Sequence, residues 1–299
     1  MPKERITQDE KVFPLELNFC RKCSHLQLSY VVSPEVLFRS YVYVSGTSPV
    51  MIKHLKEYAK EAAYLVDLRK EDFVFEFGSN DGTLLRHFKN LGFDNVLGMD
   101  PAKNIAEIAT AAGLKTISKF FSFESAKDVR SNFGPAKLIC ANHCCAHIDD
   151  FHSIVRGVKE LLAEDGIWIF EVGYLFSVVK HSLFDTIYHE HLDFHSVEPI
   201  RRFCSEQGLQ LLSASAVSIQ GGSLRCVVGW PGTSPAIAGG SDAIANLVRA
   251  EAAAGLHSEA VFLRWVCPVF CVTIFVFHCF YICDDRERWL NPSTLPETR

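Results

Sequence analysis

Short apolar runs alternate with amphipathic stretches between residues 70 and 230, and this alternation limits the possible folds more than any other feature. Apolar runs typical of buried strands cover Phe73–Phe77, Asn95–Met99, Lys137–Ala141 and Gly166–Val172. Helical patterns cover Met51–Arg69, Thr83–Leu91, Ile105–Ala112, Phe151–Leu162, Leu175–Ser182 and Ala243–Leu256. Repeated strand–helix units predict an α/β fold with a mostly parallel, doubly wound sheet. Gln210–Ala216 and Leu224–Gly229 are expected to complete the sheet as antiparallel edge strands.

The charge balance excludes one broad class of function. The 299 residues carry 30 Lys and Arg against 35 Asp and Glu, a net charge of −5, whereas a general nucleic-acid binder needs a basic surface. Residues 1–12 are polar and charged, so no signal peptide is expected there. The 11 cysteines are an odd number and are clustered, which favours reduced thiols over a disulfide framework. We therefore expect a cytoplasmic protein that does not bind nucleic acid.

Composition divides the chain into four parts. Residues 1–69 contain a cysteine pair, several aromatic residues and a helix, and residues 70–230 carry the strand–helix repeats. Residues 231–260 are a linker rich in Pro, Gly and Ser followed by a helix. Residues 261–299 differ from the rest because the segment 265–283 is apolar and carries no formal charge. Its length is close to that of a membrane-spanning helix, but we favour an unrelated divergent tail over a membrane anchor.

A glycine-bounded loop joins the first strand of the repeats to its helix. The residues of this strand end and loop are Glu76, Gly78, Ser79, Asn80, Asp81 and Gly82. Glycine lets the backbone turn tightly and approach a ligand closely, and open α/β sheets bind ligands at the carboxyl ends of their strands. The loop lacks the spacing and the lysine of phosphate-binding loops. Its acidic residues suit a cationic or ribose-bearing ligand.

Two further side chains are expected at the same sheet edge. Asp100 ends the second strand, where a carboxylate accepts hydrogen bonds from both ribose hydroxyls. Asn142 ends the third strand and is expected to border the same ligand. The loop and Asp100 together resemble the S-adenosylmethionine-dependent methyltransferases of the Rossmann-like class. That resemblance implies S-adenosylmethionine as the cofactor.

Histidines are concentrated in two segments that come after predicted strands. One is ANHCCAHIDD, at 141–150, and the other is FDTIYHEHL, at 184–192. Histidine accepts a proton near neutral pH, and a neighbouring glutamate can orient it or balance its charge. Histidine clusters also bind zinc, and a single histidine is more often structural than catalytic. The residues alone leave these interpretations open.

Six motifs, which follow one another along the chain, give a closer resemblance to one family. They are PEVLFRSYVYVSGTS at 34–48, EFGSNDG at 76–82, the histidine segments at 141–150 and 184–191, GVKELLAEDGIWIFEV at 157–172 and QGGSLR at 220–225. Together they resemble the sugar C-methyltransferase family, which acts on nucleotide-linked 4-keto-deoxysugars. The resemblance covers roughly residues 13–260. It implies a Rossmann-like class I methyltransferase core with a small N-terminal region, a divergent C-terminal tail and a nucleotide sugar as the small-molecule substrate.

The family resemblance also assigns roles to individual residues. In this chemistry a base removes the proton beside the keto group, and the resulting enolate takes the methyl group. The resemblance implies His191 as the base and Glu190 as its partner. Tyr188 and His147 are implied to stabilise the enolate oxygen or orient the sugar. One of Tyr41 and Tyr43 is implied to reach the site from the N-terminal region, and His189 and His195 stay open as alternatives for the base.

The chain departs from that family at both ends. The family carries a four-cysteine zinc site made of two CxxC pairs, whereas Cys20 and Cys23 form a single pair here. Four thiolates close a structural zinc site and two do not, so we expect two free surface thiols on a hairpin rather than bound zinc. The resemblance fades near residue 260, so we expect a truncated methyltransferase. A catalytically impaired cofactor-binding protein and a membrane-anchored methyltransferase with another acceptor are the alternatives.

Overall fold

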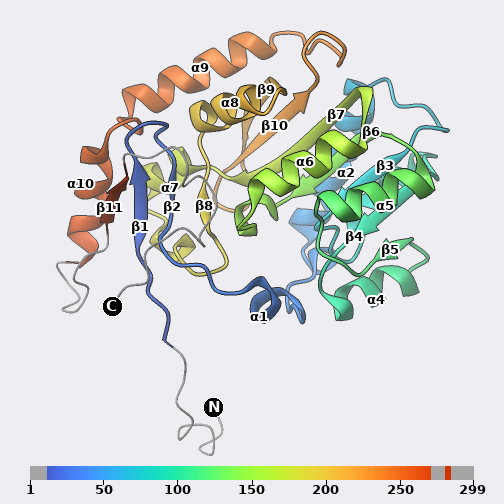
Figure 1. The fold of residues 1–299 in the computed structure, drawn as a ribbon, viewed down its shortest axis with the longest axis horizontal. Coiled ribbons are helices and arrows are strands. Elements are labelled where there is room, and N and C mark those ends of the chain that lie inside the picture. The colour runs from blue at the N-terminus through green and yellow to red at the C-terminus, as the bar shows by residue number, and fades with distance from the viewer. Residues whose placement is uncertain (1–11, 271–279, 284–299) are drawn as a thin grey trace, which may run out of the picture.

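The protein is built around a seven-stranded sheet (Figure 1). The computed structural model describes residues 12–270 and 280–283. Across the sheet the strands are β5 (Thr116–Ile117), β4 (Val96–Met99), β3 (Val74–Phe77), β6 (Ala136–Asn142), β7 (Leu162–Gly173), β10 (Ser223–Gly229) and β9 (Gln210–Val217). The first five are parallel, and β10 and β9 are antiparallel to their neighbours. The predicted α/β fold with two antiparallel edge strands is confirmed.

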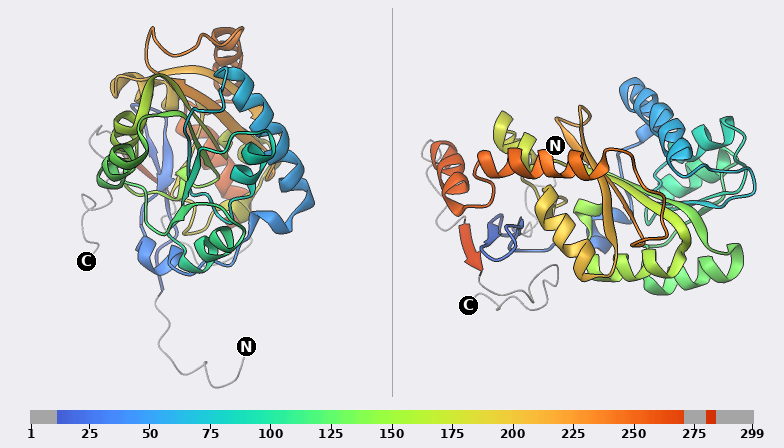
Figure 2. Two further views of the ribbon diagram at one scale, coloured as in Figure 1. Left: turned by 90° about the vertical axis from the view of Figure 1, so that its right-hand side faces the viewer. Right: turned by 90° about the horizontal axis from the view of Figure 1, so that it is seen from above.

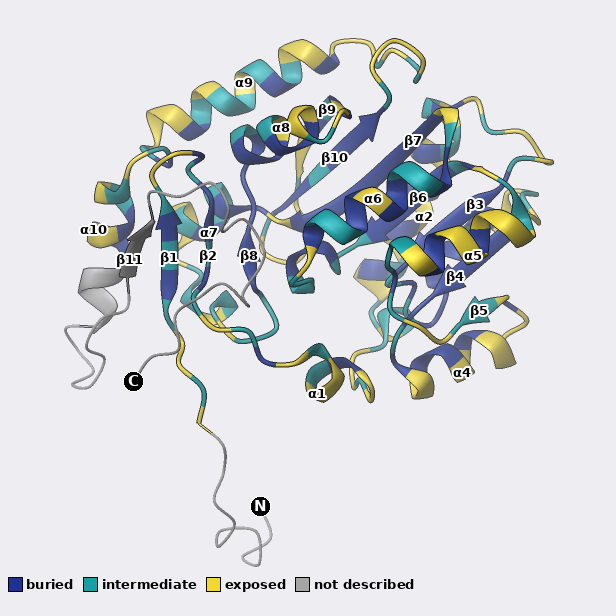
Figure 3. Ribbon diagram, in the orientation of Figure 1, coloured by how far each residue is buried: buried dark blue, intermediate teal, exposed yellow. Residues whose placement is uncertain are grey.

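Helices cover both faces of this sheet (Figure 2). One face carries α2 (Pro49–Leu65), α3 (Thr83–Asn90) and α4 (Lys103–Ala111), and the other carries α5 (Phe123–Phe133), α6 (Phe151–Leu161), α8 (Val197–Glu206) and α9 (Gly240–Ala253). Side chains alternate along each strand, so Phe75 and Phe77 pack towards α5 and α6, whereas Val74 packs towards α2 and α3. The buried strands of Figure 3 lie between these two apolar layers.

A smaller four-stranded sheet lies beside the main one. Its order is β11 (Phe280–Cys283), β1 (Leu17–Cys20), β2 (Leu26–Leu28) and β8 (Asp193–Phe194). It packs with α7 (Leu175–His181) and with α10 (Glu259–Phe270) through a third apolar cluster that includes Phe19, Phe262 and Trp265. The apolar segment 265–283 thus contains the end of α10 and the strand β11, and its residues 271–279 lie outside the described part. Among the described residues, no helix has both the length and the apolar character needed to cross a membrane.

Four short helical turns lie at the carboxyl ends of the parallel strands. They are α1 (Pro34–Phe38), η2 (Ser45–Thr47), η3 (Cys145–His147) and η4 (Phe184–Thr186). The strand order reverses between β3 and β6, so the connections after these two strands run in opposite directions and leave a crevice there. A cavity of about 1010 Å³ opens at this edge and is lined by residues from all four turns.

Candidate active site

The predicted glycine loop forms a tight strand-to-helix turn at the edge of the cavity. Gly78, Asn80 and Gly82 all have positive φ angles, of 63°, 49° and 74°. A side chain at Gly78 would also meet Cys144, because a Cβ atom there would lie 2.6 Å from the Cβ and Sγ atoms of that cysteine. Glycine is therefore required at Gly78 for both conformation and space. The loop lines the cavity through Gly78, Ser79 and Asn80.

Asp100 and Glu76 place two buried carboxyl groups beside this loop. The Oδ2 atom of Asp100 accepts the Asn80 N–H at 2.9 Å, and its Oδ1 atom accepts the Ala102 N–H at 2.9 Å. Burial raises the pKa of Asp100, although these two donors oppose the shift. Burial, followed by the neighbouring Cys144, Asp81 and Asp100, raises the pKa of Glu76 well above its usual range. Asp100 is thus held in place with lone pairs left for a ligand.

The chain before α2 packs directly on the glycine loop. Asn80 accepts the Ser45 N–H through Oδ1 at 2.9 Å and donates through Nδ2 to the Tyr43 carbonyl at 3.0 Å. Gly46 lies so close to Asp81 that a Cβ atom at Gly46 would be 2.3 Å from its Oδ2 atom. The Asp81 carboxylate itself accepts from the Thr83 hydroxyl at 2.8 Å. Asn80 therefore holds the N-terminal region against the loop, and Gly46 packs closely on Asp81.

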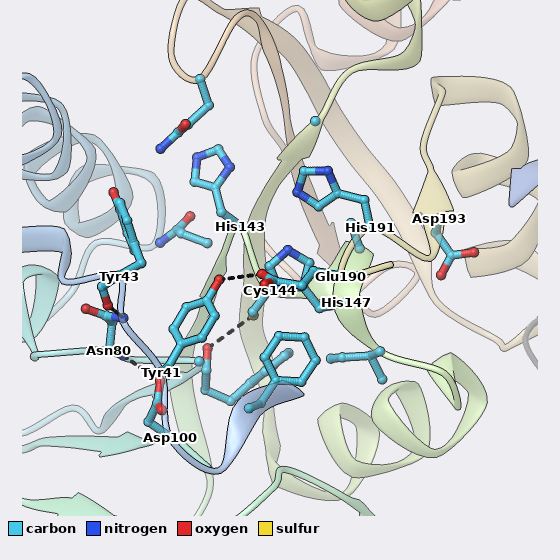
Figure 4. A pocket seen from close by; sticks show the side chains of 18 of the residues that line it. Tyr41, Tyr43, Asn80, Asp100, His143, Cys144, His147, Glu190, His191 and Asp193 are labelled. Carbon is cyan, nitrogen blue, oxygen red and sulfur yellow. Dashed lines mark hydrogen bonds between the residues drawn. The ribbon is translucent and has the colours of Figure 1, made fainter. Parts of the chain in front are cut away.

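Tyr41 links that N-terminal region to the second histidine segment. Its hydroxyl donates to the Oε2 atom of Glu190 at 2.8 Å, across 149 residues of sequence. Its backbone is fixed by two hydrogen bonds to the Asn104 side chain, at 3.1 and 2.8 Å. Burial and the Glu190 carboxylate raise the pKa of Tyr41, so its hydroxyl keeps the proton that it donates. Figure 4 shows Tyr41 and Glu190 joined across the cavity, with Tyr43 on the same side as Asn80.

His191 has a defined pattern of hydrogen bonds. Its Nδ1 atom lies 2.8 Å from the Thr186 carbonyl, which can only accept, so Nδ1 carries the proton. Its Nε2 atom lies 3.1 Å from the Tyr188 hydroxyl, which therefore donates to the Nε2 lone pair. Burial lowers the pKa of His191, although the Thr186 carbonyl and Glu190 oppose the shift. His191 is neutral near pH 7, with a basic nitrogen at the cavity.

His147 stacks between two rings. Its ring centroid lies 5.5 Å from that of Phe38 and 5.2 Å from that of His191. Burial lowers the pKa of His147 to about 3, and the nearby His191 and His143 add to the shift. His147 is therefore neutral and cannot act as a cation near pH 7. The structure brings together Tyr41, Tyr43, His147, Tyr188, Glu190 and His191 around one cavity.

The two alternative histidines lie outside the cavity lining. The Nε2 atom of His189 lies 3.0 Å from the Pro14 carbonyl, and its ring packs on Phe13. His195 is buried between the rings of His25 and Phe151. Burial lowers the pKa of His195 to about 4. Of the three histidines that the sequence proposes as the base, His191 is the one that borders the cavity.

The cysteine pair lies in the turn between β1 and β2, away from this cavity. Cys23 is buried and Cys20 is partly exposed, so the expectation of two surface thiols is wrong for Cys23. A hydrogen bond from Cys23 lowers the pKa of Cys20 to about 5. In the described part of the chain, no group of three or more His, Cys, Asp or Glu side chains is arranged to hold a metal.

Sequence reasoning missed a charged cluster next to the cavity. Glu171 on β7 is fully buried, with its Oε2 atom 2.7 Å from His54 Nε2 and its Oε1 atom 2.6 Å from Arg225 Nε. His143 Nε2 lies 3.6 Å from the same carboxylate, and His143 also lines the cavity. The one signal in the sequence was a glutamate inside the otherwise apolar run Gly166–Val172.

The cavity fits the cofactor that the sequence resemblance implies. Its described lining contains several carboxyl groups and neither Lys nor Arg, which suits a cationic sulfonium. Buried polar atoms without a hydrogen-bond partner in the described part face it from Glu76 Oε2, Ser79 Oγ and both side-chain atoms of Asn142. These atoms can bind the amino acid end of S-adenosylmethionine, and Asp100 can bind its ribose hydroxyls.

Comparisons with known proteins agree with this geometry. The family described as "Methyltransferase domain" matches residues 51–214, and one described as "Putative zinc binding domain" matches residues 1–38. The chain is 36% identical over 215 residues to the C-methyltransferase NovU of Streptomyces niveus. That match covers 72% of this chain and 51% of NovU, so the chain spans about half the length of this curated relative.

Solved structures give weaker likenesses. The magnesium protoporphyrin IX methyltransferase ChlM of Synechocystis PCC 6803 has a TM-score of 0.46 at 13% identity, over 60% of this chain and 85% of that one. An S-adenosylmethionine-dependent methyltransferase of Clostridium acetobutylicum ATCC 824 has a TM-score of 0.46 at 14% identity, over 60% and 92%. The family match itself covers more than half of the chain. The chain therefore belongs to the methyltransferase domain family, with a Rossmann-like class I fold and S-adenosylmethionine as its cofactor.

Proposed function

We propose that the protein is a C-methyltransferase that methylates the carbon beside the keto group of a nucleotide-linked 4-keto-deoxysugar. The likeness to NovU supports methyl transfer to carbon. The six motifs that resemble the sugar C-methyltransferases support the sugar acceptor. In this proposal residues 70–230 bind the cofactor, and residues 1–69 contribute Tyr41 and Tyr43 to the acceptor site.

The observation that carries the proposal is the hydrogen-bonding state of His191. With the proton fixed on Nδ1 by the Thr186 carbonyl, Nε2 is unprotonated and can take a proton from an acidic C–H bond. Tyr188, which donates to Nε2, is placed to turn its hydroxyl to the acceptor as the acceptor enters. A keto group makes the neighbouring C–H acidic enough for a neutral imidazole to act on it.

The remaining residues orient the acceptor and balance charge. Glu190 offsets the positive charge that His191 gains, and the Tyr41 hydroxyl holds Glu190 in place. Tyr188 and His147 orient the keto oxygen as it gains negative charge. When bound, S-adenosylmethionine supplies a sulfonium methyl that the deprotonated carbon takes up. Holding both reactants in one cavity removes much of the entropic cost of their encounter.

Labelled methyl transfer tests this function. The full chain is incubated with methyl-labelled S-adenosylmethionine and a nucleotide-linked 4-keto-6-deoxyhexose, while calorimetry measures cofactor binding. We expect stoichiometric transfer of label to the sugar. Cofactor binding without transfer to any ketosugar would instead support a cofactor-binding protein that lacks transferase activity.

A further inference from the structure

The chain between α1 and η2 borders the cavity without forming a helix or a strand. Tyr41, Val42 and Tyr43 all line the cavity. In the part of the chain that the structure describes, none of these three residues takes part in a hydrogen bond between two backbone groups. Val42 is 94% exposed, so burial of its side chain does not fix the segment either. The groups that bind this backbone therefore decide where the two tyrosines lie.

Two asparagine side chains bind the backbone of this segment. Asn104 on α4 accepts the Tyr41 N–H through Oδ1 at 3.1 Å and donates through Nδ2 to the Tyr41 carbonyl at 2.8 Å. Asn80 in the glycine loop accepts from the Ser45 N–H and donates to the Tyr43 carbonyl. Asn104 thus exchanges both bonds with one residue, as paired residues of antiparallel strands do. The amide fixes the position and the direction of the Tyr41 backbone.

The Tyr41 side chain extends from this fixed backbone to the proposed base. Its hydroxyl donates to the Oε2 atom of Glu190 at 2.8 Å, and Figure 4 shows this bond across the cavity. Burial lowers the pKa of the neighbouring His191, and the Glu190 carboxylate opposes that shift, so Glu190 and His191 interact. Hydrogen bonds weaken steeply when donor and acceptor are misaligned. A displaced Tyr41 backbone would therefore release Glu190 from its place beside His191.

Asn104 itself is remote from the reacting groups. Its side chain is exposed, and among the described residues it is not part of the cavity lining, whereas Pro101 and Ala102 just before it are. We propose that Asn104 is a positioning residue for the acceptor reaction: its amide fixes the Tyr41 backbone so that the Tyr41 hydroxyl holds Glu190 beside His191. The inference rests on the proposed function and deepens it.

The variant Asn104→Ala removes both hydrogen bonds to the Tyr41 backbone. The bonds from Asn80 remain, so we expect the segment to shift rather than detach, and kcat to fall about fivefold, the effect of about one hydrogen bond. The loss should appear in kcat more than in KM for the acceptor, because Glu190 offsets a charge that His191 gains only during the reaction. Cofactor affinity, measured by calorimetry, should stay within about twofold.

A matched control and a partial reaction narrow the interpretation. The control is Asn95→Ala, because the Asn95 amide donates to the Glu71 carbonyl and lies outside the described lining of the cavity. Exchange of the acceptor C–H with deuterated water requires the base but not the transfer of the methyl group. That exchange should slow in Asn104→Ala by the same factor as kcat, and should be unchanged in Asn95→Ala.

A double variant separates positioning from a structural role. If Asn104 acts through the Tyr41 hydroxyl, its removal has no further effect once that hydroxyl is absent. The kcat of Asn104→Ala combined with Tyr41→Phe should then equal that of Tyr41→Phe alone, within about twofold. A structural role of Asn104 in α4 would instead lower kcat by the same factor in both backgrounds.

The outcomes separate this inference from the function on which it rests. Wild-type protein that neither exchanges the C–H nor transfers methyl overturns the proposed function, and the inference with it. With active wild-type protein, an Asn104→Ala variant as active as Asn95→Ala overturns the inference alone. So does an equal loss of kcat with and without the Tyr41 hydroxyl, or a loss of cofactor affinity as large as the loss of kcat. A lower kcat that disappears in the Tyr41→Phe background, with cofactor affinity unchanged, supports the inference.

Discussion

The two ends of the cavity are built in different ways. At the cofactor end, Glu76, the Gly78–Gly82 loop and Asp100 follow one another within a single strand–helix–strand unit. At the reaction end, Tyr41, His143, His147 and His191 come from segments that meet only after folding. The cofactor end is therefore determined by local geometry, whereas the reaction end depends on long-range docking.

This difference also appears in the hydrogen bonds. The Asp100 carboxylate is held by two backbone N–H groups, from Asn80 and Ala102, which backbone geometry alone supplies. Glu190 is held by a side-chain hydroxyl from Tyr41, far away in sequence. We expect substitutions at the cofactor end to change cofactor affinity, and those at the reaction end to change the chemical step while cofactor affinity stays the same.

The largest expected effect comes from removing the basic nitrogen of His191. His191→Gln should lower the methyl-transfer rate by about 10²–10⁴-fold, the range for loss of a general base. Cofactor affinity should remain within about threefold in calorimetry. The matched control is His189→Gln, because His189 bonds to the Pro14 carbonyl outside the cavity. A larger loss for His189→Gln than for His191→Gln would mean that His189, and not His191, is the base.

The second effect tests the cofactor end. Asp100→Asn replaces one carboxylate oxygen by an amide nitrogen, which accepts no hydrogen bond. At least one hydrogen bond to the carboxylate, from a backbone N–H or from a ribose hydroxyl, is therefore lost. At roughly 1.5–3 kcal/mol for such a bond, cofactor affinity should fall about 10- to 100-fold. Calorimetry of Asp100→Asn and of the exposed control Asp94→Asn measures this. Unchanged affinity with slowed chemistry would mean that Asp100 belongs to the reaction end.

A smaller effect is expected where the N-terminal region meets the reaction end. Tyr41→Phe removes the hydroxyl that donates to Glu190 and leaves the Asn104 contacts to the Tyr41 backbone intact. We expect kcat/KM for the acceptor to fall about tenfold, equivalent to about 1.4 kcal/mol. Steady-state kinetics at saturating cofactor measures it. If cofactor affinity fell by the same factor, the cofactor end and the reaction end would not be energetically independent.

The pH dependence of kcat/KM tests the assignment of His191 as the base. A general base works only when unprotonated, so kcat/KM should fall on the acid side as His191 gains a proton. Because burial lowers the pKa of His191, the midpoint of that limb should lie below 6.5, the usual histidine value. Initial rates between pH 4.5 and 8 locate it. A midpoint above 6.5 would contradict a desolvated His191 as the base.

The sequence predicted the parts of the fold that have regular local patterns. Strands β3, β4, β6 and β7 lie within a few residues of their predicted ranges, because buried strands are continuous apolar runs. Helices α5 and α8 were missed. The α5 helix begins with a capping box formed by Ser122 and Ser125, a variant without the glutamate that usually marks such a start. The small sheet was missed because its strands are two to four residues long.

The charged cluster at Glu171 could not be predicted from the sequence. Its partners His54, His143 and Arg225 converge because of the β7–β10 register and the packing of α2, and neither is a local property of the chain. Likewise, the neutral state of His147 follows from its burial beside Phe38 and His191, which no spacing indicates. The residue types at the reaction end were visible in the sequence, whereas their protonation states required the structure.

The position of the transferred methyl group decides directly whether the protein methylates carbon. The full chain is given S-adenosylmethionine with a ¹³C-labelled methyl group and a nucleotide-linked 4-keto-6-deoxyhexose, and the product is examined by ¹³C NMR. We expect a methyl carbon bonded to the ring carbon beside the keto group, seen as carbon–carbon coupling in a sugar labelled at that carbon. A methyl signal typical of an ether or an amine, without that coupling, would contradict it.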